Sequence, residues 1–300
     1  MKTIQERIAT LKKEKNALII AHLYQPPEIQ DIADFVGDSL ELSRLAKDAE
    51  ADVIIFCGVF FMAGSAKLLS PHKTVILPNK NAGCPMADMA TPEDIIKLRQ
   101  KHPDAAVVTY VNSSVEVKAH SDICCTSSNA VKIVNSLPNQ DIIFVPDKNL
   151  GSYVARFKDK NIILFDGYCP THNRTTTDHI LKARNEHPNV KILVHPECPA
   201  PVVDMADFAG STAQIINYVT ASDEKEFVIG TEKGILHQLK LKNPDKTFYM
   251  LADNFLCPNM KKTSLESVLE SLETGEFEIE LSDEMIKKAS RSLQKMLDVK

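Results

Sequence analysis

The sequence predicts an α/β protein of three pseudo-equivalent units, each a short parallel sheet covered by helices on both faces in three αβα layers. Strand-like runs alternate with helical patterns along the 300 residues, and these runs are continuously apolar, as in buried parallel strands. The alternation occurs three times, and a Cys-Pro dipeptide ends each repeat, at Cys84, Cys169 and Cys257, with spacings of 85 and 88 residues. We therefore expect the units to bring these cysteines to one point.

Each unit is expected to contain a lead-in helix, three strands separated by two helices, and the cysteine loop. Because three strands make a small sheet, the units should pack against each other. The first strands are expected within 17–25, 105–114 and 190–198, the second within 52–59, 141–148 and 226–233, and the third from 74, 161 and 247. The units are expected at 1–90, 91–174 and 175–260, with the tail 261–300 packing back on the first unit.

Composition excludes several classes of partner. There are 35 basic and 40 acidic residues, a net charge of −5, and no basic run, so nucleic acid and anionic membrane are poor candidates. The charged N-terminal segment lacks the apolar core of a signal peptide, and no apolar run approaches the roughly 20 residues of a membrane helix. The seven cysteines, an odd number, are expected to be reduced in a cytoplasmic protein.

Polar side chains gather where the first strand of each unit ends and the next helix begins. A parallel sheet binds its ligand beyond the carboxyl ends of its strands, and a helix N-terminus with a hydroxyl residue can hold an anion. The same hydroxyl residues are also the usual N-caps of helices. Threefold recurrence favours a shared site for a substrate with several negative groups, at His22, Tyr24, Ser39, Tyr110, Asn112, Ser127, His195, Glu197, Ser211 and Thr212.

The three loop cysteines leave three interpretations open. A [4Fe–4S] cluster ordinarily has four cysteine ligands; with three, one iron stays open and can act as a Lewis acid. A Cys₃His zinc site with His172 or His195 is possible, although no CxxC pair is present. Plain buried thiols are the third interpretation. Cys57 is expected in the core, and of the adjacent Cys124 and Cys125 one is expected in the core and one in a loop.

The chain resembles the quinolinate synthases over essentially its whole length. The resemblance is carried by residues 21–40, 109–131, 146–155, 194–199, 209–215, 230–239 and 257–262. It implies three αβα domains in a triangle, with a [4Fe–4S] cluster at the centre held by Cys84, Cys169 and Cys257. It also implies a transferase that condenses iminoaspartate with dihydroxyacetone phosphate to quinolinate, the precursor of NAD, with loss of phosphate and water. An oxidase or dehydrogenase would supply the iminoaspartate.

The resemblance also suggests roles for the polar residues. Tyr24 and Tyr110 become candidates for proton transfer, since a phenol near a metal-bound group can have its pKa lowered from about 10. Glu197 is the candidate acid/base for a tautomerisation. His22 and His195 are expected to act on carboxylate or carbonyl groups, and both count as catalytic candidates. The expected holders of carboxylates and phosphate are Ser39, Asn112, Ser127, Ser211 and Thr212.

Two alternatives remain beside this resemblance. Another three-cysteine cluster enzyme on a triplicated fold, similar to diphthamide synthase, would share the cysteines. A metabolite-binding αβα protein with structural zinc would share only the fold. The chain departs from the usual family pattern at Leu23, Phe60, Gly64 and Tyr168, which are expected at the rim of the site.

Overall fold

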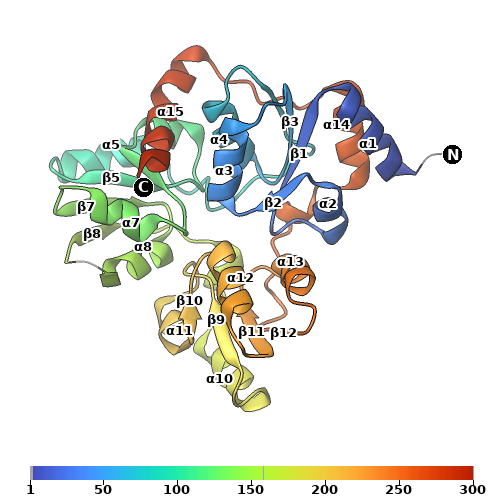
Figure 1. The fold of residues 1–300 in the computed structure, drawn as a ribbon. Coiled ribbons are helices and arrows are strands. Elements are labelled where there is room, and N and C mark those ends of the chain that lie inside the picture. The colour runs from blue at the N-terminus through green and yellow to red at the C-terminus, as the bar shows by residue number, and fades with distance from the viewer. Residues whose placement is uncertain (1–2, 158, 300) are drawn as a thin grey trace.

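The computed structural model describes residues 3–157 and 159–299, which form three separate four-stranded parallel sheets (Figure 1). Figure 1 shows the sheets at the corners of a triangle, with the third unit, in yellow and orange, below the other two. The α/β class and the three pseudo-equivalent units are confirmed. All three sheets have the same order, with an edge strand of two or three residues first, then the first, second and third predicted strands of the unit.

The prediction of three strands per sheet is wrong, because each sheet has a fourth strand at its edge. Two or three residues are too few for a hydrophobic period to stand out. The strands are β2 (Phe35–Gly37), β1 (Ala17–His22), β3 (Val53–Cys57) and β4 (Thr74–Ile76); β6 (Ile123–Cys125), β5 (Ala106–Tyr110), β7 (Asp141–Val145) and β8 (Asn161–Leu164); and β10 (Phe208–Ala209), β9 (Lys191–Val194), β11 (Glu226–Gly230) and β12 (Thr247–Met250).

An aspartate before each short strand explains why the edge forms there. Asp34 Oδ2 accepts the backbone N–H of Ile19 at 2.9 Å. Asp122 does the same for Val107 at 2.7 Å and Asp207 for Ile192 at 2.8 Å. Spacings of 88 and 85 residues separate the three aspartates, so each repeat uses the same side chain to join its first strand to its edge strand.

Helices cover both faces of the sheets, and side chains cap many of them. Thr91 and Ser211, for example, each form a reciprocal capping box with the third residue of the helix that follows. The helices are α1 (Ile4–Glu14), α2 (Pro27–Ile32), α3 (Ser39–Asp48), α4 (Phe60–Leu69), α5 (Pro92–Lys101), α6 (Val115–Ala119), α7 (Ala130–Ser136), α8 (Lys148–Val154), η1 (Ala155–Phe157), α9 (Pro170–Asn173), α10 (Thr177–Glu186), α11 (Ala200–Met205), α12 (Thr212–Ala221), α13 (Ile235–Lys242), η2 (Asn259–Lys261), α14 (Leu265–Thr274) and α15 (Asp283–Asp298).

The two tail helices pack in different places. Helix α14 lies against α1 and β3 of the first unit, whereas α15 contacts α6 and β6 of the second unit as well as α4 of the first. Leu293 and Met296 of α15 are fully buried in a core that also contains Ile20 and Val108. The final helix therefore joins the first two units, and the expectation that the whole tail rests on the first unit is too narrow. The domain boundaries themselves remain a prediction.

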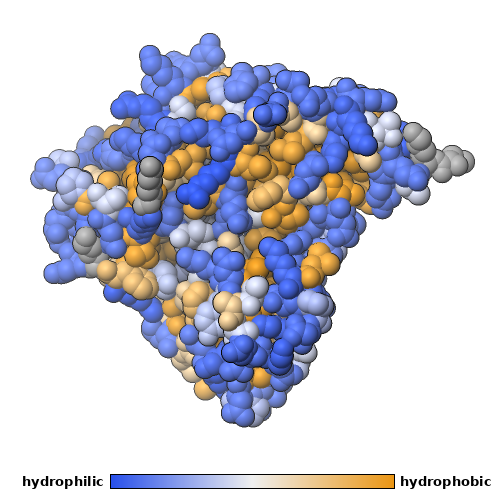
Figure 2. Space-filling model, in the orientation of Figure 1, coloured by the Kyte–Doolittle hydropathy of each residue, from blue (hydrophilic) through white to orange (hydrophobic). Residues whose placement is uncertain are grey.

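Cys124 and Cys125 are both buried on β6, so the expectation of one loop thiol is wrong. Cys57 is a core thiol, as expected. On the visible face, hydrophilic residues dominate the periphery and apolar residues gather toward the centre over the first unit (Figure 2). In the described part of the chain, no helix combines the length and apolar character that crossing a membrane requires.

Candidate active site at the junction of the three units

The carboxyl ends of the strands of all three sheets surround one pocket. Of the residues predicted to bind substrate or the metal centre or to act in catalysis, it contains all except Ser211. Ser211 instead caps α12, and its hydroxyl lies 2.8 Å from Ser128 Oγ. The predicted residues in the pocket are His22, Tyr24, Ser39, Cys84, Tyr110, Asn112, Ser127, Cys169, His195, Glu197, Thr212 and Cys257.

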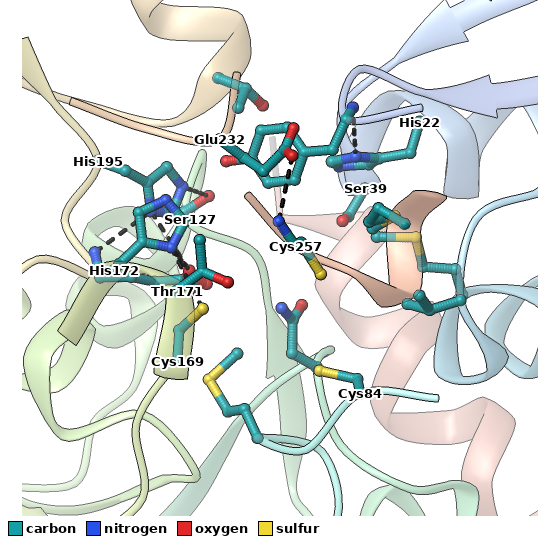
Figure 3. A pocket seen from close by; sticks show the side chains of 18 of the residues that line it. His22, Ser39, Cys84, Ser127, Cys169, Thr171, His172, His195, Glu232 and Cys257 are labelled. Atoms are coloured by element: carbon teal, nitrogen blue, oxygen red, sulfur yellow. Dashed lines mark hydrogen bonds and ion pairs between the residues drawn. The ribbon is translucent and has the colours of Figure 1, made fainter. Parts of the chain in front are cut away.

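The three loop cysteines line this pocket from three sides (Figure 3). Each follows the last strand of its sheet, and all three are free thiols. Burial raises the pKa of Cys84 to about 12, and burial also raises the pKa of Cys169 and of Cys257. Neutral thiols become thiolates when they bind a positively charged metal centre. The site therefore offers three latent thiolates to such a centre.

The spacing of the donors distinguishes a single ion from a larger group. Tetrahedral zinc with Zn–S bonds of about 2.3 Å places its sulfurs about 3.8 Å apart. Among the described residues, the trio with donor atoms all within 4.8 Å is Cys169, His172 and Glu197, not the three cysteines. The three sulfurs thus do not close on one ion, which disfavours the Cys₃His zinc site.

Two histidines occupy equivalent turns at the ends of β1 and β9. His22 Nδ1 accepts the Tyr24 N–H at 3.1 Å, and His195 Nδ1 accepts the Glu197 N–H at 3.2 Å. In neutral imidazole this leaves the proton on Nε2, and the Nε2 of His195 lies 3.2 Å from Ser127 Oγ. Burial lowers the pKa of His22 to about 3 and that of His195 to about 4. Both rings are therefore neutral Nε2–H donors.

A continuous series of polar contacts crosses the pocket between the two tyrosines. Tyr110 donates to Glu197 Oε1 at 2.8 Å, and Glu197 Oε2 lies 2.8 Å from His172 Nδ1. His172 Nε2 lies 2.9 Å from Thr231 Oγ1, which is 2.7 Å from the Tyr24 hydroxyl. Residues from all three units thus form one hydrogen-bonded path.

Burial opposes the ionisation of Glu197. The nearby His195 and His172, together with the hydrogen bonds that Glu197 accepts, outweigh burial, and the pKa of Glu197 is lowered. Burial, together with the Glu197 charge, raises the pKa of Tyr24 and of Tyr110 well above 10. The expected lowering of the phenol pKa refers to a phenol beside a metal-bound group and stays a prediction. The two tyrosines are hydrogen-bonding phenols, able to donate a proton, and Glu197 is the anionic centre between them.

Comparison with known proteins follows this geometry. A family model described as Quinolinate synthetase A protein matches residues 6–298. The chain belongs to this family. It is 53% identical over 300 residues to the quinolinate synthase of Caldicellulosiruptor bescii, which covers 100% of this chain and 99% of that protein. Over 296 residues it is 51% identical to the quinolinate synthase of Clostridioides difficile, covering 98% and 97% of the two chains.

The four departures from the usual quinolinate synthase pattern lie outside the pocket lining. Leu23 is buried in an apolar cluster with Leu193. Phe60 is 49% exposed at the start of α4. Gly64 is buried in α4, where a Cβ would lie 3.1 Å from Val115. The Tyr168 ring lies under the ammonium of Lys148 at 5.1 Å.

Sequence reasoning missed several residues of the family site. His172 entered only as a zinc ligand, and Glu232 and Thr171 were not considered, although all three line the pocket. Asp38 also lines it, caps α3 and accepts a hydrogen bond from Ser128. The 85-residue spacing between Asp147 and Glu232, which is one of the two spacings of the repeat, is a signal that could have found Glu232.

The buried histidine predicts how stability depends on pH in the metal-free protein. The pKa of His22 falls from 6.5 to about 3 on folding because the ring is buried. The contribution of neutral His22 to the free energy of unfolding is therefore complete above pH 6.5 and is lost as pH falls toward 3. At pH 5 the loss is about 2 kcal/mol. The free energy of unfolding, measured with urea, should fall less between pH 7.5 and pH 5 for His22→Asn than for the wild type. This variant keeps an acceptor for the Tyr24 N–H. Equal acid losses in both proteins would contradict this assignment.

Proposed function

We propose that this protein is a quinolinate synthase that condenses iminoaspartate with dihydroxyacetone phosphate to quinolinate, with loss of phosphate and water. The observation that carries the proposal is the 53% identity over the whole chain to a protein of that name. The pocket supports it, because cysteine, histidine, tyrosine and glutamate side chains from three units meet there. The substrates are small molecules, and we propose that a separate oxidase or dehydrogenase supplies the iminoaspartate.

The cofactor that fits the pocket is a [4Fe–4S] cluster held by Cys84, Cys169 and Cys257. Each unit contributes one thiol, and among the described residues the compact trio of donors that could hold a single ion contains Cys169 but neither of the other two cysteines. When bound through three cysteines, such a cluster has one open iron, which supplies a Lewis acid for substrate oxygen atoms.

Neutral donors and helix starts are suited to hold the anionic groups of the substrates. Among the described residues that line the pocket, none is lysine or arginine. The Nε2–H groups of His22 and His195, and the helix starts at Ser39 and Thr212, provide donors instead. Asn112 Oδ1 is buried without a hydrogen-bond partner, so it is available to accept from a substrate N–H or O–H group.

The path from Tyr110 through Glu197 and His172 to Tyr24 is suited to moving protons. Quinolinate formation requires proton transfers to and from carbon, nitrogen and oxygen atoms of the two substrates as they condense. The Glu197 carboxylate, hydrogen-bonded to a phenol and an imidazole, can accept a proton from the substrate on one side of the pocket. A phenol can donate a proton to the substrate on the other side. We assign the tautomerisation to Glu197, with Tyr110 and Tyr24 as proton donors.

The direct test is quinolinate formation by anaerobically purified protein given dihydroxyacetone phosphate and iminoaspartate generated in the assay. Quinolinate and inorganic phosphate should appear in equal amounts and depend on both substrates. Parallel incubations with S-adenosylmethionine test the alternative of a different three-cysteine cluster enzyme. Turnover there, with no quinolinate, would replace the proposal.

A further inference from the structure

One backbone hydrogen bond holds the cysteine loop in the same way in all three units. In each unit, the N–H of the third residue after the second predicted strand donates to the carbonyl two residues before the cysteine. These bonds are Phe60 to Ala82, Lys148 to Gly167 and Lys233 to Phe255, at 2.8, 2.8 and 2.9 Å. Spacings of 88 and 85 residues relate the three donors, as they relate Asp34, Asp122 and Asp207. The residue just before each donor is therefore structurally equivalent in the three units.

In two units this equivalent residue is a buried acid that holds the cysteine. Asp147 is fully buried, and its Oδ2 accepts the Cys169 N–H at 3.1 Å while Oδ1 accepts the Leu150 N–H at 2.7 Å. Glu232 is also fully buried, and its Oε1 accepts the Cys257 N–H at 3.2 Å. Each acid therefore fixes its cysteine at the backbone, in addition to the carbonyl bond that all three loops share.

In the first unit the equivalent residue is Val59. It is buried at the start of α4 and provides no side-chain cap, and a valine has no group that can accept the Cys84 N–H. The aspartate before the edge strand is thus present in all three units, at Asp34, Asp122 and Asp207. The acid that holds the cysteine is present in two units only, because the first unit has Val59 there. The Cys84 loop has one of the two contacts that hold its counterparts.

We propose that Asp147 and Glu232 are positioning residues that hold Cys169 and Cys257 in place for the metal centre, a contact that the Cys84 loop lacks. Each acid replaces the water that a loop N–H would otherwise bind, so the loop keeps one conformation whether or not metal is bound. The significance for a cluster rests on the proposed function, but the holding of the loops does not.

The test is therefore made on metal-free full-length protein and needs no turnover. A limiting amount of iodoacetamide is added, and the alkylation rate of each cysteine is followed by peptide mass spectrometry. In Asp147→Ala, we expect Cys169 to react roughly tenfold faster than in the wild type, the effect of losing one buried hydrogen bond. Cys84 and Cys257 should change less than about twofold. Glu232→Ala should accelerate Cys257 alone.

Two further variants make the result specific. Asp147→Asn replaces the carboxyl group by an amide but keeps an oxygen acceptor, so it should restore most of the slow rate at Cys169. Asp122→Ala removes a carboxylate that also accepts a backbone N–H in the second unit and should leave Cys169 unchanged. Buried Cys57 and Cys198 report whether a variant has unfolded. Equal rates for Cys169 in Asp147→Ala and the wild type, or in Asp147→Asn and Asp147→Ala, would overturn the proposal.

Discussion

Replacing Cys169 with alanine is expected to remove the visible iron–sulfur absorption and quinolinate formation together. Cys169 lines the pocket, and the second unit contributes no other thiol to it. Two thiolates from the remaining units cannot hold a cluster that already has one fewer cysteine than usual. The loss of activity should be complete within the detection limit of the assay, and iron per chain should fall to near zero.

Cys198 provides the matched control for this change. It is also followed by proline, but it is fully buried in the apolar core of the third unit and does not line the pocket. Cys198→Ala should keep its iron content and its specific activity within about twofold, with some loss of stability from the smaller side chain. A Cys169→Ala protein with a full cluster and normal turnover would show that the ligand assignment is wrong.

The second large effect is expected at the carboxylate in the middle of the pocket. Glu197→Gln keeps the shape of the side chain but removes the negative charge that lies between Tyr110 and His172. General acid–base catalysis typically contributes about 10²–10⁴-fold, so kcat should fall in that range while KM changes only a few fold. Steady-state kinetics on protein matched for iron content separates the two parameters.

A carboxylate–tyrosine pair on the surface of the same unit gives the control. Glu226 accepts a hydrogen bond from Tyr249 at 2.9 Å, and both lie outside the pocket. Glu226→Gln should leave kcat and KM unchanged. If Glu197→Gln retained kcat within about twofold, the proton path through this residue would not take part in the reaction.

Much of the fold could be predicted because the same order of strands, helices and cysteine loop recurs three times in the sequence. The spacing of Cys84, Cys169 and Cys257 indicated three units and one meeting point, and continuous apolar runs indicated buried parallel strands. Strand β4, which also has only three residues, was predicted, whereas the edge strands β2, β6 and β10 were not. Their positions depend on an aspartate that contacts a strand 15 residues away in the sequence, and no local pattern encodes such a contact.

The chemistry of the site was less predictable than its composition. Residue types and strand ends indicated His22, Tyr110 and Glu197, but the direction of a pKa shift depends on burial and on which charges lie nearby. Glu197 raises the pKa of both tyrosines, although it is far from them in the sequence. His172 joins the path only because α9 brings it to Glu197 and Thr231.

The most direct test of the central claim is the iron and acid-labile sulfide content of protein purified without oxygen, measured together with its visible spectrum. A [4Fe–4S] cluster on Cys84, Cys169 and Cys257 predicts about four iron and four sulfide per chain, with a broad absorption band near 400 nm. Stoichiometric zinc, or no metal after anaerobic reconstitution, would contradict it and leave the pocket without its Lewis acid.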